Sequence, residues 1–222
     1  MTEEHFFELT KYERGLAEKG IKIIAGLDEA GRGPLAGPVA AGCVIFRAQG
    51  PFPEADDSKK LTPKKRDALF ETVKEMSLGW GVGLADSEEI DRMNILNATY
   101  LAMRRAVENA LKDASERLGA IKPETILVDH VHVPKIEIPQ LSITHGDALS
   151  VTIGAASILA KVTRDRLMEE YDKQYPGYGF AAHKGYGTAA HYAAIRELGI
   201  SPIHRRTFLK NLSDHFAAEG GR

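Results

Sequence analysis

The stretch IKIIAGLDEAGRGPLAGPVAAGCVIF, residues 21–46, decides the fold. Its first seven residues (21–27) form an apolar run that predicts a buried β-strand, and residues 38–46 predict a second strand. The intervening DEAGRGPLAGP is rich in glycine and proline, as is typical of a loop. This segment therefore predicts two strands joined by a loop that begins with two carboxylates, Asp28 and Glu29.

Helices and strands alternate outward from this segment. The pattern predicts helices over residues 1–20, from Thr62 and Pro63 to about Met76, from Asp86 or Ser87 to about Leu118 with a break near Asn94, from about Gly154 to Tyr175, and near 188–198. It predicts further strands over about 78–85, 125–129 and 141–147. This order predicts an α/β fold with a mixed sheet covered by helices.

Composition limits the class of protein. A chain of 222 residues can bury enough surface to fold without disulfides or a structural metal. Its only cysteine, Cys43, lies in an apolar run, so we expect a buried thiol and a cytoplasmic, reducing location. No apolar stretch approaches the ~20 residues that span a bilayer, and the mixed-charge N-terminus has no signal-peptide core. The net charge of −2 argues against bulk electrostatic coating of nucleic acid, although it allows a local basic groove.

Acidic residues follow three of the apolar segments. Asp28 and Glu29 follow KIIAGL, Asp129 follows ILV, and Asp147 follows SITHG. Ligands of open α/β sheets gather at strand ends, and clustered carboxylates need a cation to offset their repulsion. Carboxylate oxygens are the preferred ligands of Mg²⁺ and Mn²⁺, so the pattern predicts a site for two divalent ions that acts on a phosphate.

Each acid on its own also suits a turn or a helix cap. Neighbours on a strand point to opposite faces, so Asp28 and Glu29 can face one site only if the chain bends there. We expect the glycine-rich segment that follows to allow the bend. Its centre, Gly31-Arg32-Gly33, could also cradle an anion or a sugar hydroxyl with backbone N–H groups, or form a plain tight turn.

Basic residues gather in two segments. Lys59, Lys60, Lys64, Lys65 and Arg66 surround one predicted helix start, and residues 183–212 carry five basic residues (Lys184, Arg196, Arg205, Arg206 and Lys210) against one acidic residue. Phosphate contacts drive nucleic-acid affinity, so these segments could line a groove. The alternative, a solvated helix face, is favoured for residues 64–66.

The long helix places Ser157, Lys161 and Asp165 on one face at a spacing of four residues. Asp165 could be a further metal ligand, but a salt bridge to Lys161 or to an arginine is the favoured interpretation. Tyr186 stands between glycines in HKGYGT, where an aromatic ring could stack on a base or sugar or pack in the core.

Taken together, these stretches resemble ribonuclease HII, the type 2 ribonuclease H. The matching segments are GLDEAGRGPLAGPV (26–39), DSKKL (57–61), EIDRMNILNAT (89–99), ILVD (126–129), HGD (145–147), AASILAKVTRDRLM (155–168), YGFAAHKGYGT (178–188) and HRRTF (204–208). They run in family order from about residue 20 to 210, and the first and sixth are highly specific.

The resemblance implies one RNase H-like catalytic domain over residues 1–222, with a helical, substrate-binding extension from about residue 175. It implies a Mg²⁺- or Mn²⁺-dependent endonuclease that cuts the RNA strand of RNA–DNA hybrids and nicks 5′ of single ribonucleotides in duplex DNA. We expect a monomer, and the sequence names no replication partner.

The family's acids map onto Asp28, Glu29, Asp129 and Asp147, which selects Asp147 over Asp165. Its Gly-Arg-Gly motif maps onto Gly31, Arg32 and Gly33, which would read the 2′-hydroxyl. Its junction-sensing tyrosine maps onto Tyr186, and we expect further substrate contacts from Lys59, Ser157, Lys161 and Lys184.

Two residues depart from the family pattern. His130 stands where the family commonly has Gly, and His145 stands where it often has Lys. Neither change removes an acid, but both put the metal preference and the pH optimum in question.

Two other functions remain open. A junction resolvase of similar fold would cut four-way DNA junctions and ignore ribose. A non-catalytic hybrid-binding module would bind the duplex equally well after chelation and yield no product.

Overall fold

A five-stranded mixed sheet forms the centre of the computed structural model, which describes residues 1–55 and 62–210. The strands are β1 (Ile23–Ala30), β2 (Val39–Arg47), β3 (Gly79–Ala85), β4 (Thr125–Asp129) and β5 (Gln140–Ile143), in the spatial order β3-β2-β1-β4-β5. β1, β2 and β3 pair antiparallel, whereas β4 and β5 run parallel to β1. The expected α/β class with a mixed sheet is confirmed.

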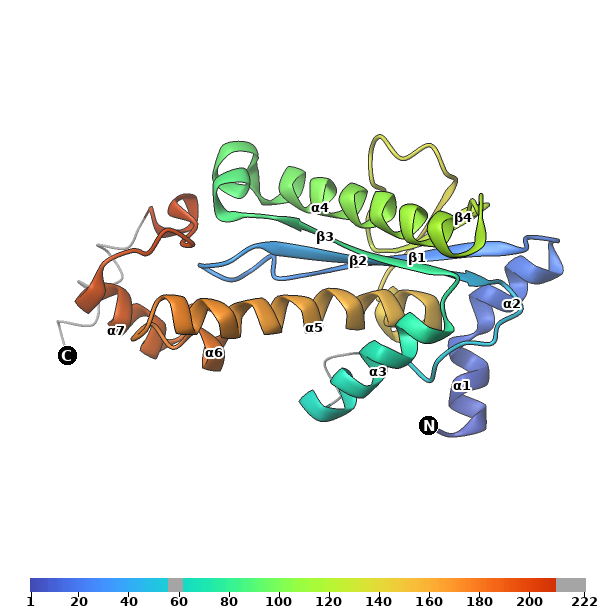
Figure 1. Cartoon of the computed structure of the whole chain (residues 1–222), viewed down its shortest axis with the longest axis horizontal. Coiled ribbons are helices and arrows are strands. Elements are labelled where there is room, and N and C mark those ends of the chain that lie inside the picture. The colour runs from blue at the N-terminus through green and yellow to red at the C-terminus, as the bar shows by residue number, and fades with distance from the viewer. Residues whose placement is uncertain (56–61, 211–222) are drawn as a thin grey trace.

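Helices cover both faces of this sheet. α4 (Ser87–Leu118) lies on one face and α5 (Val151–Gln174) on the other (Figure 1). α1 (Glu3–Leu9), α2 (Lys11–Glu18) and α3 (Pro63–Met76) lie on the side of α5 (Figure 1). α1 contributes Leu9 and α3 contributes Phe70 and Val73 to the core beneath α5, and Leu16 of α2 packs against it. The alternating side chains of each strand thus enter one of two cores, as a two-faced sheet requires.

The packing of α5 on the sheet depends on glycine at two strand positions. A Cβ atom on Gly26 would lie 2.2 Å from the carbonyl oxygen of Thr152, and one on Gly42 would lie 2.2 Å from that of Ala156. Only glycine permits so close a backbone approach. Because Gly42 pairs with Asp28, this contact sets the depth at which α5 crosses the end of β1.

Several element boundaries differ from the sequence prediction. The expected helix over residues 1–20 is broken at Thr10, whose hydroxyl bonds back to the carbonyls of Phe6 and Phe7 and competes with the helical ladder. The expected strand 21–27 extends to Ala30, so Asp28 and Glu29 belong to β1 and not to the loop.

The third acidic segment also differs. The predicted strand 141–147 ends at Ile143, and a 3₁₀ turn over Gly146–Ala148 follows it. α5 begins at Val151, ahead of Gly154, because the Ser150 side chain accepts a hydrogen bond from the N–H of Ile153 and caps the helix.

Other boundaries are confirmed. The Thr62 hydroxyl caps α3, and Asp86 forms a capping box with Glu89 at the start of α4. The break expected near Asn94 is present, since that residue has φ 68° and ψ 163° inside α4.

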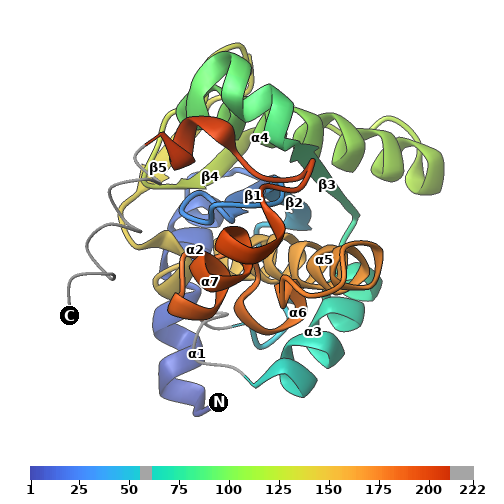
Figure 2. The same ribbon diagram turned by 90° about the vertical axis from the view of Figure 1, so that its left-hand side faces the viewer.

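The segment after α5 has a small core of its own. It contains α6 (Phe180–His183), which the sequence analysis missed, α7 (Ala189–Leu198) and a 3₁₀ turn, η3 (Arg206–Leu209). Figure 2 shows these elements in front of the end of the sheet where β1 and β2 are joined. An isolated bridge pairs Ala36 with His204, so the β1–β2 loop is held against this C-terminal segment.

Within the described part of the chain, none of the helices has the length and apolar character that a membrane span needs.

Candidate active site

A cavity of about 270 Å³ opens at the end of β1, where pairing with β4 has stopped at Leu27. It brings together most of the residues that the sequence analysis selected. The lining residues are Asp28, Glu29, Ala30, Gly31, Arg32, Gly33, Asp129, Ser157, Lys161, Arg164 and Tyr186.

Asp28 is the most deeply buried of the acids in this cavity, with 5% of its surface exposed. Burial raises its pKa well above the usual value, and the negative charges of Glu29 and Asp129 raise it further, while the Ser157 hydroxyl lowers it in part. Ionised Asp28 is therefore unfavourable until a cation balances the charge.

Glu29 shares the cavity but has its own counter-charge. Its Oε1 atom lies 3.3 Å from a guanidinium nitrogen of Arg32. Burial raises the pKa of Glu29, and Asp129 adds to the rise, whereas Arg32 opposes it. The pKa of Glu29 stays raised, so the effect of burial on this carboxyl outweighs that of Arg32.

The expected bend between the two acids is not present. Asp28 pairs with Gly42, Glu29 with Ala41 and Ala30 with Ala40, so the β1–β2 ladder continues through both acids. Both side chains reach one cavity because β1 extends past the last residue that pairs with β4, which leaves this edge of the strand open.

Asp129 ends the neighbouring strand β4, and its Oδ1 accepts a hydrogen bond of 2.7 Å from the N–H of Gly146. This bond ties the acid to the 3₁₀ turn that carries Asp147. Asp147 itself is buried next to the site but does not line the cavity.

These carboxylates fit a hard divalent cation by their chemistry. Among the described residues, no three His, Cys, Asp or Glu side chains form a group that could hold a metal ion. Mg²⁺, however, is usually bound through one or two carboxylates together with waters and substrate phosphates, not by a complete protein cage. Three carboxylates that repel one another in one cavity suit such an ion.

The Gly31-Arg32-Gly33 loop forms one wall. Gly31 has φ +90°, and a Cβ there would lie 2.0 Å from Nε of Arg164, so only glycine fits. At Gly33 a Cβ would lie 3.7 Å from the Tyr186 ring, so this residue lies directly beside Tyr186.

Two buried arginines support this loop, and the sequence analysis did not identify their contacts. Arg164 donates to the carbonyls of Pro38, Ala36 and Lys184, and Arg205 donates to those of Gly37, Arg32 and Gly31. Arg205 was expected on the rim of a basic groove, but it has no exposed surface. Burial, and then Arg164, lower the pKa of Arg205 to about 9, so it stays charged at neutral pH.

The lysines that were expected to contact the substrate differ in their position relative to the cavity. Lys161 lines the cavity and pairs with Asp165 at 2.6 Å, so the salt bridge favoured for Asp165 is confirmed. Lys184 bonds to Glu169 at 2.7 Å and lines an adjacent cavity instead. Lys59 lies outside the described residues.

Tyr186 is 47% exposed at the cavity mouth. Its carbonyl accepts a hydrogen bond from His191, which also contacts His204. His204 begins the HRRTF segment and His191 follows HKGYGT by three residues, but sequence alone does not show that the two histidines meet.

The two departures from the family pattern share one backbone feature. His130 and His145 both have φ 58°, in the left-handed region that favours glycine. The glycine common in the family at position 130 would therefore suit the backbone found here. The buried thiol expected at Cys43 is confirmed, and burial raises its pKa to about 12.

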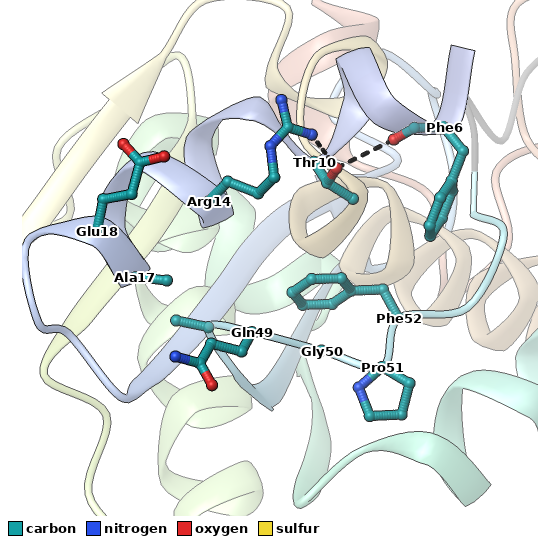
Figure 3. A pocket seen from close by; sticks show the side chains of 10 residues that line it. Phe6, Thr10, Arg14, Ala17, Glu18, Gln49, Gly50, Pro51 and Phe52 are labelled. Carbon is teal, nitrogen blue, oxygen red and sulfur yellow. Dashed lines mark hydrogen bonds between the residues drawn. The ribbon is translucent and has the colours of Figure 1, made fainter. Parts of the chain in front are cut away.

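A second cavity, of about 580 Å³, lies at the opposite end of β1 (Figure 3). It is bounded by α1, α2 and residues 48–52, and its charged side chains are Arg14 and Glu18. Arg14 is already engaged by the Thr10 hydroxyl at 2.7 Å and by the Phe7 ring. This cavity lacks a cluster of catalytic side chains.

Comparison with known proteins agrees with this geometry. The family model described as ribonuclease HII matches residues 25–211. The ribonuclease HII of Clostridioides difficile (strain 630) is 51% identical over 95% of this chain and 79% of its own length. That of Geobacter sulfurreducens is 55% identical over 89% of this chain and 87% of its own length.

Solved structures agree on the fold. The crystal structure of ribonuclease H2 from Pyrococcus horikoshii OT3 superposes with a TM-score of 0.65 at 29% identity, covering 88% of this chain and 99% of that one. A structure of Bst-RNase HIII in complex with Mn²⁺ superposes with a TM-score of 0.66 at 17% identity, over 90% and 71% of the two chains. The chain therefore belongs to the ribonuclease HII family, whose members are metal-dependent ribonuclease H endonucleases.

Proposed function

We propose that this chain hydrolyses the RNA strand of RNA–DNA hybrids, and nicks 5′ of single ribonucleotides in duplex DNA, at the cavity at the end of β1. The observation that carries the proposal is the meeting of Asp28, Glu29 and Asp129 with the Gly31–Gly33 loop and Tyr186 in one cavity. The carboxylates can hold the divalent ions that phosphodiester hydrolysis needs. The Gly31–Gly33 loop and the Tyr186 ring can contact a ribose.

Asp28, Glu29 and Asp129 would hold two divalent ions, Mg²⁺ or Mn²⁺, with Asp147 as a further ligand carried by the adjoining turn. When bound, such ions lower the pKa of an attacking water and stabilise the departing oxygen in an in-line displacement. Cleavage would leave a 3′-hydroxyl and a 5′-phosphate.

The remaining groups orient the substrate. Backbone N–H groups of the Gly31–Gly33 loop would contact the 2′-hydroxyl, which distinguishes RNA from DNA. Tyr186 would stack on the neighbouring sugar. Lys161 and Arg32, at the cavity wall, would contact phosphate without reading sequence, and Ser157 would orient Asp28. Lys184 and Lys59 would contact the duplex farther from the cut.

The proposal also covers the domain organisation, the oligomeric state and the location of the protein. Residues 1–222 would act as one catalytic unit in which the segment from about residue 175 is the substrate-binding extension. The single buried thiol fits a cytoplasmic location, and the mixed charge without a large apolar run fits a monomer.

A labelled DNA duplex with one ribonucleotide tests the function. We expect a nick directly 5′ of the ribonucleotide with Mg²⁺ or Mn²⁺, none with chelator, and none in an all-DNA duplex. Cleavage of a four-way junction without ribonucleotide cleavage would support the resolvase instead, and binding without cleavage would support the non-catalytic module.

Asp129→Asn tests the site within the same assay. The substitution keeps the size of the side chain and an acceptor for Gly146, so we expect loss of turnover with an unchanged fold by circular dichroism. Near-normal activity of this variant would show that the site is assigned wrongly.

A further inference from the structure

The carbonyl groups of Gly31 and Arg32 point into the protein, toward the side chain of Arg205. The guanidinium of Arg205 donates to the carbonyl of Gly31 at 2.6 Å, of Arg32 at 2.8 Å and of Gly37 at 2.9 Å. All three nitrogen atoms of the fork are used, so the side chain is held in one orientation.

The direction of these carbonyls fixes the direction of two N–H groups. In a trans peptide the C=O of one residue and the N–H of the next point in opposite directions. Because Arg205 binds the carbonyls of Gly31 and Arg32, the N–H groups of Arg32 and Gly33 point away from its guanidinium. Both residues line the cavity.

These two N–H groups have no acceptor among residues 1–55 and 62–210. By contrast, the N–H of Leu35 bonds to the carbonyl of Gly185, and that of Gly37 bonds to the carbonyl of Ile203. The loop therefore presents two donors without an acceptor in the described ranges beside the cavity.

Arg205 is an unusual support for a loop, because it is fully buried and no carboxylate in the described ranges forms an ion pair with it. Its charge is balanced by carbonyl dipoles and by the Phe208 ring, 5.2 Å from the guanidinium carbon. A buried charge without an ionic partner is costly. We therefore expect the guanidinium of Arg205 to serve a function that a neutral side chain would not supply.

We propose that Arg205 is a positioning residue for ribose recognition: it orients the N–H groups of Arg32 and Gly33 toward the 2′-hydroxyl by binding the carbonyls on the other side of the loop. This inference rests on the proposed function of the cavity. Arg164, which holds Ala36 and Pro38, fixes the far end of the same loop.

Arg205→Met and Arg205→Lys test the proposal on the duplex with one ribonucleotide. Methionine removes all three hydrogen bonds, and lysine keeps the charge but cannot bind three carbonyls in the plane of a fork. We expect kcat/KM to fall about 100-fold for both variants, the size expected for a misplaced recognition group. KM should rise, while the inhibition constant of an unlabelled all-DNA duplex in the same assay stays within about twofold.

A merely structural role gives a different pattern. Partial unfolding removes active enzyme, so kcat would fall with KM unchanged. Arg105→Met is the matched control, because Arg105 also binds a carbonyl (Leu84) and Glu89 but does not line the cavity. Full activity of Arg205→Lys, or a KM for Arg205→Met equal to that of the wild type, would overturn the proposal.

A measurement on the wild-type protein covers the case in which neither variant folds. We expect the amide resonances of Arg32 and Gly33 to shift on adding the ribonucleotide duplex in the presence of chelator, and not on adding the all-DNA duplex. Equal shifts with both duplexes would contradict the proposal. A wild type that does not cleave at a ribonucleotide would contradict the proposed function itself. The comparison of variants with an active wild type tests only the role of Arg205.

Discussion

The Nε2 atoms of His191 and His204 lie 3.1 Å apart, so these two buried imidazoles share a single proton. The N–H of Ser201 donates to Nδ1 of His204, which must therefore carry its proton on Nε2. His191 then accepts at Nε2 and donates from Nδ1 to the carbonyl of Tyr186 at 2.9 Å. Both rings are neutral, and the chain of bonds ends on the residue at the cavity mouth.

This relationship predicts an acid-sensitive fold. Burial lowers the pKa of both imidazoles to about 4, while an unfolded histidine has a pKa near 6.5. Between these values the unfolded chain binds more protons, so stability falls as the pH drops from 6.5 toward 4. The loss is up to about 1.4 kcal/mol per pH unit for each ring.

Urea unfolding at several pH values checks this prediction. His204→Asn should flatten the dependence over pH 4.5–6.5, whereas His132→Asn, at an exposed position, should leave it unchanged. Equal slopes for the wild type and His204→Asn would show that the pair is not the source.

Asp28→Asn should stabilise the metal-free protein while abolishing activity. At neutral pH the ionised Asp28 is disfavoured by burial and by Glu29 and Asp129. Removing the charge should raise the free energy of unfolding by on the order of 1 kcal/mol, the equivalent of one pKa unit. Urea titration with chelator measures this, and a loss of stability would contradict it.

With a divalent ion present, the wild type should become more stable than Asp28→Asn. We expect Mg²⁺ to bind the folded wild type, so that at 100 times its Kd it adds about 2.7 kcal/mol to the free energy of unfolding. Asp28→Asn should gain much less, and Asp67→Asn, an exposed acid outside the cavity, should gain as much as the wild type. The same Mg²⁺ stabilisation in Asp28→Asn would place the ion elsewhere.

Two glycines of one motif should respond differently to alanine. Gly31→Ala places a Cβ 2.0 Å from Arg164 at φ +90°, and should cost roughly 2–4 kcal/mol of stability. At Gly33 the nearest atom is 3.7 Å away, so Gly33→Ala should fold normally but cleave the ribonucleotide duplex more slowly. Thermal melting and cleavage rates separate the two, and a normal melting curve for Gly31→Ala would be the contrary result.

Glu13 should stabilise the protein from outside the catalytic cavity. Its Oε1 accepts from the Ser150 hydroxyl at 2.6 Å and the Thr152 N–H at 3.1 Å, at the start of α5. Glu13→Ala leaves both donors buried without an acceptor and should cost about 1–3 kcal/mol, whereas Glu13→Gln keeps an acceptor and should cost less. Chemical denaturation of both variants tests the order.

The order of apolar runs, caps and glycines in this sequence was sufficient to predict the α/β class, the capped starts of α3 and α4 and the break at Asn94. These features depend on interactions within a few residues, which a local pattern contains. The acids at strand ends likewise indicated a metal site, because the residue after a buried strand is held rigidly in place.

The tertiary structure decided what depends on contacts between distant segments. The length of β1 beyond Glu29 depends on its pairing with β2, and the burial of Arg205 depends on a loop 168 residues away in the chain, at Gly37. The pattern HRRTF was expected on the rim of a basic groove, since charge in the sequence does not reveal which side chain faces the core. Folding brings carbonyls of the β1–β2 loop to this arginine, and a buried cation then stabilises the loop at the cavity.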